Sequence, residues 1–420
     1  MRRSLRLIGN LILMVILFAI LFTFAMFQGG FVSWFLFFSF LPIFLYHLGL
    51  LLYPMKRWHV TRRLSDNNVR AGGKVSVTIQ ITRKIPFPLY YCIVEEIFPD
   101  SLMDIYYRDK YKYVNETEIP TFARRLKKIL FPWFKRHITI PYELNRLPRG
   151  DHTLNAIRVR TGDIFGFIKK EYTFPVKHQF VTYPSSYELQ IKEQLSSFEQ
   201  GTTTSFSPQM SQSNVVSGVR EYVPGDKFSQ IDWKQTARKN EMMTKEFEQE
   251  RSTNTVLIFD ACAFEGINVL DFEGAIEMVL SLLNTLQSQG ANVGVLSIGN
   301  DVIHFPTHKD QKKLEWVRQH LTHIRPARER VFSVALDQET DIFNNRPIVM
   351  VVTTHIDDPV RQSLKKLRQR MGTIVVILVR STVISRPNED GIIDQLRYDG
   401  FSVCILTERE LMKSKIEVDI

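Results

Sequence analysis

Two apolar runs at the start of the chain constrain its fold more than any other feature. The first extends from Leu7 to Phe27 and, after a Gln-Gly-Gly turn, the second extends from Phe31 to Tyr53. Each run is about 20 residues long, which is the length that an α-helix needs to cross the hydrocarbon core of a bilayer. We therefore predict a transmembrane helix hairpin in residues 1–55, with spans at about 7–27 and 31–53.

The charges that flank these runs predict the orientation of the hairpin. No Asp or Glu precedes Asp66, so the two spans carry no acidic group into lipid. Lys and Arg remain preferentially on the cytoplasmic side of a membrane. A cleaved signal peptide is the alternative for the first run, but a second run follows at once and a small-residue cleavage site is missing. Both termini are thus expected in the cytoplasm, because basic residues stand on both flanks: Arg2, Arg3 and Arg6 before the first span, and Lys56, Arg57, Arg62 and Arg63 after the second.

The charge and cysteine content narrow the function classes. Three cysteines (Cys92, Cys262 and Cys404) indicate no disulfide framework, which fits a reducing compartment. The net charge of +10 is uneven, at about +3 before residue 54, about +11 over 54–190 and about −4 beyond. Anionic lipid headgroups favour a basic segment beside the membrane. A nucleic-acid partner is not expected, because no recognised binding motif is present and the C-terminal half is acidic.

Residues 56–189 are typical of an antiparallel β-sandwich. Runs such as KVSVTIQITRK and RHITIPYEL alternate apolar and polar residues, and turn signals such as Ala71-Gly72-Gly73 separate them. The basic, aromatic stretch at 123–136 is interpreted as a long loop or hairpin with a solvated face, with contact to a membrane surface as the alternative. Residues 190–217 are polar and rich in Ser, Thr and Gln, and we predict a linker there.

The remainder of the chain, residues 218–420, ends in an α/β pattern. Continuous apolar runs (TNTVLIFDA, ANVGVLSIG, RPIVMVVTT, GTIVVILV and FSVCILT) alternate with helical patterns at about 268–289, 309–324, 331–343 and 359–370. Strands of this kind indicate a parallel sheet that is buried on both faces. We therefore predict a Rossmann-type α/β domain whose ligands bind at the carboxyl ends of the strands.

A dense set of charges precedes this domain. It comprises Gly218, Arg220-Glu221-Tyr222, Pro224-Gly225-Asp226, Ile231-Asp232-Trp233 and Ala237-Arg238. The segment resembles the signature G-x-R-E-Y-x-x-G-D-x-x-R-x-I-D-W-x-x-x-A-R of the bacterial family called domain of unknown function 58. Upstream, Arg149-Gly150 and residues 161–167 are similar to the R-G … D-P-F-G-L-F segment of that family. The chain departs from the family pattern at Ser229, where Arg is usual, and at Ile164, where Pro is usual.

Three roles are open for the signature segment. Pro224-Gly225 predicts a turn, and Asp226 can cap a helix over 228–239. The charges can form an internal clamp of ion pairs, a docking surface for a partner anchored by Trp233, or a catalytic acid–base pair. No nucleophile or metal cluster accompanies them, so we do not expect catalysis. The residues concerned are Arg220, Glu221, Tyr222, Gly225, Asp226, Asp232, Trp233, Lys234 and Arg238.

The resemblance implies that the C-terminal domain is von Willebrand A-like. Metal-binding members of that superfamily end their first strand in D-x-S-x-S, whereas this chain has Asp260-Ala261-Cys262-Ala263-Phe264. Both hydroxyls are missing, and a later strand ends in Thr353-Thr354-His355 where an Asp is expected. Magnesium requires oxygen ligands, so the set Asp260, Cys262 and Thr354 is a degenerate site, and we predict no metal and no cofactor. A cation-dependent binding module remains the alternative.

A second alternative is an enzyme or zinc site at one rim of the sheet. Asp260, Cys262 and His355 are expected near each other, where they can hold a soft metal or pair a thiol with a base.

The sequence otherwise lacks the phosphate-binding G-x-x-x-x-G-K-[ST] and the G-x-S-x-G and H-E-x-x-H motifs. We therefore expect a scaffold or adaptor in the bacterial cell membrane and not an enzyme. The resemblance implies a MoxR-type AAA+ ATPase as partner, with a transglutaminase-like membrane protein as a further one.

Overall fold

The protein consists of two compact units, Met1–Tyr183 and Pro184–Ile420. The computed structural model describes residues 2–103, 124–192, 211–223, 228–250, 254–306, 311–339, 348–371, 373–382, 389–413 and 415–419. The first unit carries two long helices and two β-sheets, and the second carries an α/β sheet with two smaller ribbons. The chain is therefore a multi-domain protein with mixed sheets.

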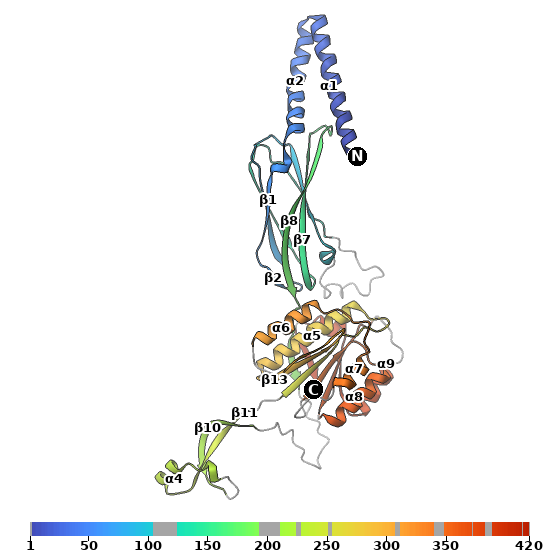
Figure 1. The fold of residues 1–420 in the computed structure, drawn as a ribbon. Helices are drawn as coiled ribbons and strands as arrows, with labels where there is room; N and C mark the ends of the chain where they lie inside the picture. The colour runs from blue at the N-terminus through green and yellow to red at the C-terminus, as the bar shows by residue number, and fades with distance from the viewer. Residues whose placement is uncertain are drawn as a thin grey trace. The chain divides into compact units, whose positions relative to one another are not determined.

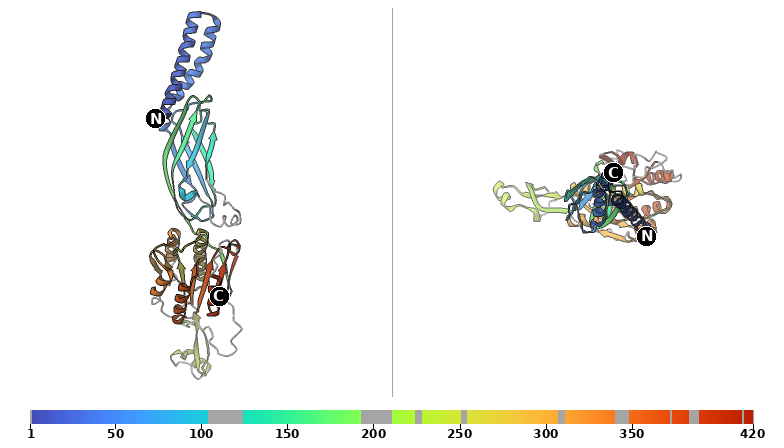
Figure 2. Two further views of the ribbon diagram at one scale, coloured as in Figure 1. Left: turned by 90° about the vertical axis from the view of Figure 1, so that its right-hand side faces the viewer. Right: turned by 90° about the horizontal axis from the view of Figure 1, so that it is seen from above.

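Two helices begin the first unit (Figure 1). α1 (Arg2–Gln28) and α2 (Phe31–Leu52) are joined at Gly29, whose φ of 60° costs glycine little. They lie side by side in both side views (Figures 1 and 2), and the rings of Phe18 and Phe37 are 5.2 Å apart. The side chains of α2 are mostly apolar, and half of them are exposed. With a mean hydropathy of 2.1, α2 is long and apolar enough to cross a membrane.

The two sheets of the first unit face each other as layers of a β-sandwich. One sheet has the order β1–β3–β6 and the other the order β2–β8–β7–β4–β5. Residues of both sheets, among them Ile79 and Val159, belong to one buried cluster. The pairing is antiparallel as predicted, except that β2 runs parallel to β8. The strands are β1 (His59–Leu64), β2 (Asn68–Arg70), β3 (Val75–Thr82), β4 (Tyr91–Ile97), β5 (Lys127–Leu130), β6 (His137–Leu144), β7 (Gly150–Gly162) and β8 (Lys169–Tyr183).

The last turn of α2 is built into the core of the sandwich. Leu50, Tyr53 and Trp58 are buried in the same cluster as the strand residues. Lys170 of β8 donates hydrogen bonds to the carbonyl oxygens of Leu51 and Tyr53 at 2.6 and 2.7 Å, which satisfies carbonyls at the end of the helix. The helix end and the sandwich are therefore held together by apolar packing and by polar contacts.

The second unit contains a six-stranded sheet of the order β14–β13–β12–β15–β16–β17. All neighbours are parallel except the edge strand β14, which is antiparallel to β13. The five strands predicted from apolar runs are present, and β14 is an addition that the sequence interpretation missed. The bounds are β12 (Asn254–Asp260), β13 (Asn292–Ile298), β14 (Val302–Phe305), β15 (Ile348–Thr353), β16 (Ile374–Val379) and β17 (Ser402–Leu406).

Helices cover both faces of this sheet (Figure 1). On one face Phe259 of β12 contacts Phe272 of α5 (Val269–Ser288), and Ser297 bonds His320 of α6 (Gln311–His323). The other face packs against three further helices in a single cluster. These are α7 (Phe332–Glu339), α8 (Asp358–Arg370) and α9 (Glu389–Tyr398), and the short α10 (Glu408–Leu411) follows β17.

Two parallel strands from opposite ends of the second unit pair beside α5. β9 (Glu188–Lys192) pairs with β18 (Lys415–Asp419), and the N–H of Tyr187 donates to the Ser281 hydroxyl of α5 at 2.7 Å. The predicted boundaries are therefore wrong here: the sandwich strands end at Tyr183, and the range 190–217 includes part of β9 and the start of β10. The middle of that range lies outside the described residues.

Candidate functional site

The carboxyl edge of the α/β sheet is the first candidate site. β12 and β15 are adjacent parallel strands, with Phe259 opposite Val352, so their ends meet at Asp260 and Thr353. The order of connection reverses between these two strands: the chain proceeds from β12 to one side of the sheet and from β15 to the other. Such a reversal is the usual position of ligands in open α/β sheets.

Asp260 is the buried acid at this edge. Its Oδ2 accepts a hydrogen bond from the Thr353 hydroxyl at 2.7 Å, and its Oδ1 accepts one from the N–H of Cys262 at 3.0 Å. Burial disfavours the charged carboxylate and raises the pKa of Asp260 from 3.8 to about 6. The two hydrogen bonds act in the opposite direction but do not offset the burial. Burial therefore places the pKa of the Asp260 carboxyl group at about 6, above its ordinary range.

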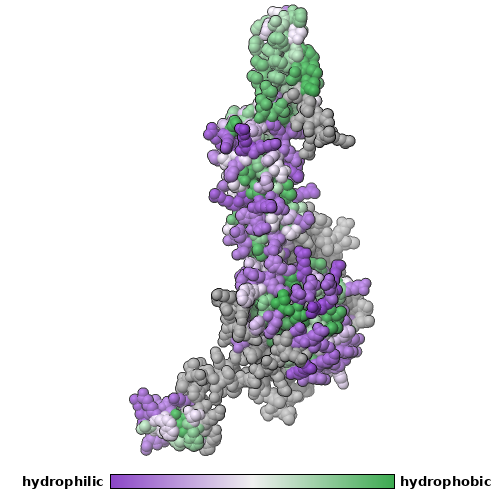
Figure 3. Space-filling view, in the orientation of Figure 1, coloured by the Kyte–Doolittle hydropathy of each residue, from purple (hydrophilic) through white to green (hydrophobic). Residues whose placement is uncertain are grey.

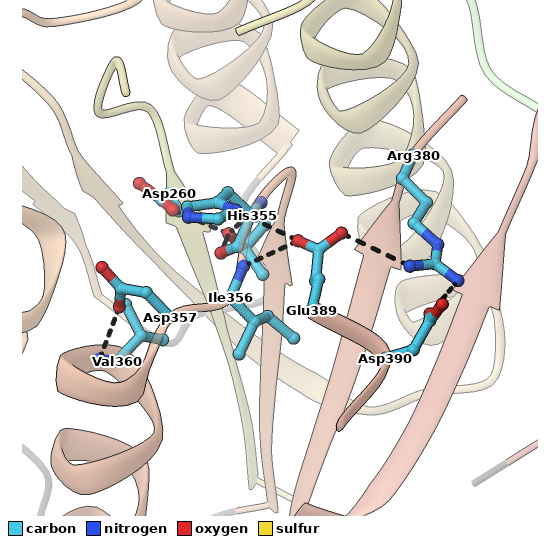
Figure 4. Close-up of polar contacts among 9 residues, drawn as sticks. Asp260, His355, Ile356, Asp357, Val360, Arg380, Glu389 and Asp390 are labelled. Carbon is cyan, nitrogen blue, oxygen red and sulfur yellow. Dashed lines mark hydrogen bonds and ion pairs between the residues drawn. The ribbon is translucent and has the colours of Figure 1, made fainter. Parts of the chain in front are cut away.

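His355 lies beside Asp260 and is tied to a second acid (Figure 4). The His355 ring stacks on Phe264, with 4.4 Å between centroids, and its Nδ1 is 3.1 Å from Oε1 of Glu389. Glu389, which is buried at the start of α9, also accepts the N–H of Ile356 at 3.1 Å. Its other oxygen is 3.4 Å from Arg380. These contacts fix the loop after β15 against the start of α9.

Cys262 is placed at this rim but is not exposed. Its side chain is buried and its Sγ lies 3.7 Å from the carbonyl oxygen of Ile298. Burial first, and then the neighbouring Asp260, raises the pKa of the Cys262 thiol to about 12. A reactive thiol requires a lowered pKa, so the burial and the raised pKa of Cys262 do not support the alternative of a nucleophile or thiolate ligand here. Cys262 packs as a small apolar side chain.

The donors at this edge do not fit a hard divalent cation. Both oxygens of Asp260 already accept protein hydrogen bonds. Phe264 offers no oxygen to a cation, and its ring packs on His355. Thr354 is buried beside Thr353. Within the part of the chain that the structure describes, no group of three or more His, Cys, Asp or Glu side chains is arranged to hold a metal.

The signature segment forms a second candidate site, which we call the signature hairpin. β10 (Ser211–Glu221) and β11 (Met243–Glu250) pair in antiparallel fashion, and α4 (Trp233–Lys239) lies between them in the sequence (Figure 1). Asp232 caps α4 by accepting the N–H groups of residues 234 and 235, both at 3.1 Å. α4 is shorter than the helix predicted over 228–239. The predicted cap Asp226 lies, together with Gly225, outside the described residues.

The signature hairpin exposes aromatic and charged side chains together. Phe228 and Trp233 are 69% and 66% exposed. Tyr222 is half-buried and its ring contacts that of Phe228 at 5.9 Å. Four charged members of this set are exposed, whereas Asp232, which caps α4, is half-buried. The exposed charged residues are Arg220, Glu221, Lys234 and Arg238.

Sequence reasoning missed two residues that complete the site at the carboxyl edge of the sheet. Thr353 and Glu389 were not singled out, although each contacts a predicted residue: Thr353 bonds Asp260, and Glu389 bonds His355. The position of Thr353 at the end of an apolar run was an available signal. Glu389 follows a segment outside the described residues, and only tertiary contact assigns it to the edge.

A protein-family match and a bacterial relative place this chain among known proteins. A family described as "Protein of unknown function DUF58" matches residues 218–389. The chain is 37% identical over 316 residues to the uncharacterized protein YeaD of Bacillus subtilis (strain 168), with 74% of each chain covered. This chain belongs to the DUF58 family. The DUF58 match begins in the signature hairpin and ends at Glu389, and it therefore includes both candidate sites.

Two solved structures that align with this DUF58 protein are remote likenesses. BslA, a bacterial hydrophobin, aligns with 28% of this chain and 97% of its own at 9% identity and a TM-score of 0.17. The PilB minor pilin from Streptococcus sanguinis aligns with 78% of this chain and 86% of its own at 8% identity and a TM-score of 0.27. Scores this low carry no argument about the function of the DUF58 chain.

Proposed function

We propose that this protein is a membrane-anchored adaptor with both termini, the β-sandwich and the second compact unit in the cytoplasm. α2 supports the anchor by its length and apolar surface, and residues Ile12–Gln28 of α1 supply a second apolar segment. The glycine turn between the helices carries no charge, whereas Lys56 and Arg57 follow α2 and are exposed. This asymmetry supports a hairpin whose turn faces away from the cytoplasm.

The C-terminal unit of the adaptor is von Willebrand A-like. In chain order its strands are arranged 3-2-1-4-5-6, with the third strand antiparallel at the edge, and an aspartate ends the first strand. The carboxyl edge of this sheet works without a bound cation, because Asp260 has protein hydrogen-bond donors and Phe264 replaces an oxygen ligand. The hydrogen bonds at this edge therefore hold the loops after β12 and β15 in a fixed arrangement that a partner protein can bind.

The partner is a MoxR-type AAA+ ATPase, and a transglutaminase-like membrane protein is a further component of the same assembly. The observation that carries the docking role is the exposure of Trp233 and Phe228 next to the cations of α4 on the signature hairpin. Aromatic residues and Arg dominate binding energy at protein interfaces. This chain lacks a phosphate-binding loop motif, so the ATPase supplies the energy for remodelling an envelope-associated complex.

Affinity capture from detergent-solubilised membranes, followed by mass spectrometry, tests this function. The native full-length chain is compared with a Trp233→Ala/Arg238→Ala variant. The matched control is Trp316→Ala, because Trp316 on α6 is 57% exposed and lies outside the signature hairpin. We expect the native chain and the control to capture the AAA+ ATPase and the double variant to lose it.

Two outcomes contradict the proposal. Equal capture by all three proteins would show that the signature hairpin does not dock the ATPase. Capture of no AAA+ ATPase by the native chain would remove the adaptor role itself. Equal melting temperatures of the three proteins guard against loss of binding by unfolding, and both substituted side chains are exposed, so little change is expected.

A further inference from the structure

Three loops gather at the end of the sandwich that receives α2. The strand registers place them there: His59, which follows α2, pairs with Thr82, and Thr82 pairs with His137. In the other sheet Tyr91 pairs with Gly162 and Cys92 with Leu130. The loops that connect these strand ends are residues 83–90, 131–136 and 163–168, which we call the α2-end loops.

The α2-end loops expose an unusual amount of apolar surface. Trp133 is 55% and Phe165 is 63% exposed. Tyr90 contacts the rings of Phe131 and Trp133 on this surface, at 5.9 and 6.2 Å. Clusters of this kind on a water-facing surface mark an interaction site. The exposed apolar members are Ile85, Tyr90, Phe131, Trp133, Phe134, Ile164, Phe165 and Phe167.

A buried arginine holds two of these loops in place. Arg83 is almost fully buried and donates hydrogen bonds to the carbonyl oxygens of Lys135 at 2.8 Å, Phe87 at 3.1 Å and Trp133 at 2.9 Å. Trp133 also has a φ of 44°, which is uncommon for a residue with a side chain. The Arg83 contacts therefore hold the loops with aromatic rings directed outward, and strain of this type marks functional surfaces.

A buried carboxylate holds the third loop against α2. Asp163 accepts the N–H groups of Phe165, Phe167 and Ile168 at 3.1, 3.2 and 2.6 Å. The same carboxylate is 3.1 Å from Nε2 of His47, which belongs to α2. The rings of Phe165 and Phe167 also lie about 6 Å from that of His47. The loop is thereby positioned beside the helix that is proposed to leave the membrane at this point.

The charges around these rings are almost all positive. Within the α2-end loops Asp163 is the acidic residue and is buried, whereas Lys84, Lys135 and Arg136 are basic and exposed. Figure 3 shows hydrophobic residues over α1 and α2, with strongly hydrophilic residues on the sandwich next to them. Aromatic rings are favoured at the headgroup level of a membrane, and cations are attracted to anionic lipid headgroups, so this combination fits an anionic lipid interface. The exposed cations are Lys56, Arg57, Lys84, Lys135, Arg136 and Lys169.

We propose that the α2-end loops form a second membrane contact, in which the aromatic rings enter the headgroup layer and the surrounding cations bind acidic phospholipid headgroups. This inference rests on the proposed membrane anchor. It adds a function to the sandwich, because the domain is then attached to the bilayer both through α2 and through direct contact of its loops with the lipid surface. A seated domain has a fixed orientation relative to the membrane, which limits the directions in which the rest of the chain meets a partner.

Depth-dependent fluorescence quenching tests the contact in the full-length chain. A Cys404→Ser background removes the partly exposed native thiol, and the two buried cysteines remain. A nitrobenzoxadiazole probe is attached to Phe134→Cys or Ile164→Cys after reconstitution into phosphatidylcholine vesicles with or without phosphatidylglycerol. Brominated phosphatidylcholine is the quencher. The matched surface control is Asp66→Cys, which is exposed and follows β1 at the opposite end of the sandwich.

A probe at Leu36→Cys, on the exposed face of α2, separates the two proposals. We expect bromolipid to quench the probes at residues 36, 134 and 164 and to leave the probe at 66 unchanged. Phosphatidylglycerol should strengthen quenching at residue 134, and Lys135→Glu/Arg136→Glu should weaken it. Each cation near an anionic surface changes the equilibrium constant for membrane contact by about fivefold. Quenching at residue 36 without quenching at 134 and 164 would overturn the loop contact alone. An unquenched probe at residue 36 would overturn the anchor, and self-quenching of loop probes between chains without a bromolipid effect would assign the loops to a second copy.

Discussion

Replacing Asp260 with asparagine isolates the effect of a buried charge at the sheet edge. Asparagine keeps the shape of the side chain, and its Oδ1 can still accept the N–H of Cys262. The Thr353 hydroxyl lies 2.7 Å from Oδ2 of Asp260 and 2.8 Å from the carbonyl oxygen of His355. It can donate to His355 and accept from the new amide. The substitution therefore removes the charge while the hydrogen-bond partners remain.

The magnitude follows from the pKa. The pKa of Asp260 is about 6 in the folded chain against an ordinary value of 3.8, so the charged carboxylate destabilises the folded state by about 3 kcal/mol at about 1.4 kcal/mol per pKa unit. Well below pH 3.8 both the folded and the unfolded chain bind the proton, and the penalty is absent. The free energy of unfolding therefore falls as the pH rises from about 4 to about 6, and Asp260→Asn removes that fall.

Hydrogen exchange of the β12 and β15 amides, followed by mass spectrometry, measures this local stability in the full chain. At pH 7.5 we expect exchange in Asp260→Asn to be slower than in the native chain by up to about 100-fold, and at pH 4 we expect most of the difference to disappear. Asp357→Asn is the control, because Asp357 caps α8 by accepting the N–H of Val360 and asparagine caps equally well. Faster exchange in Asp260→Asn than in the native chain at pH 7.5 would refute the reasoning, since it would show that the charged carboxylate is stabilised there.

Three further predictions concern buried groups. Asp163→Ala should lower the free energy of unfolding of the sandwich by roughly 3–5 kcal/mol in urea titrations, because it leaves three backbone N–H groups without their acceptor; a loss below about 1 kcal/mol would contradict this. Iodoacetamide at pH 8 should alkylate Cys404 well before Cys262, whose pKa is raised by burial to about 12, and peptide mapping that finds Cys262 modified first would reverse the conclusion. Arg62→Met should cost about 3–5 kcal/mol in the same titrations, because it leaves the buried Glu96 without its cation, and adding Glu96→Gln should recover part of the loss.

The regular parts of the fold were predictable from the sequence because their patterns are long. The helix predicted at 268–289 is α5, which begins after the cap Asn268. The predicted apolar runs correspond to β12, β13, β15, β16 and β17. They were recognisable because strands that are buried on both faces consist of continuous apolar residues. The short strand β14 and the β9–β18 pair were missed because four or five residues without a strong period carry little signal.

The candidate sites were predictable only in part. Asp260 and His355 were brought to one rim as expected, because the parallel order of the strands determines which ends meet. The contacts of these residues with Thr353 and Glu389 could not be predicted, because they depend on side-chain directions in the folded chain and not on a local sequence pattern. The R-G … D-P-F-G-L-F resemblance gave no role for Asp163, and only the tertiary contact with His47 relates that segment to the end of α2.

The binding affinity between the full-length chain in lipid nanodiscs and a purified MoxR-type AAA+ ATPase tests the central claim most directly. Interface residues that carry at least 2 kcal/mol each weaken binding about 30-fold when truncated. The account predicts measurable binding that Trp233→Ala/Arg238→Ala weakens by at least about 30-fold and that Trp316→Ala leaves unchanged. Equal affinities for all three chains, or no binding by the native chain, would contradict it.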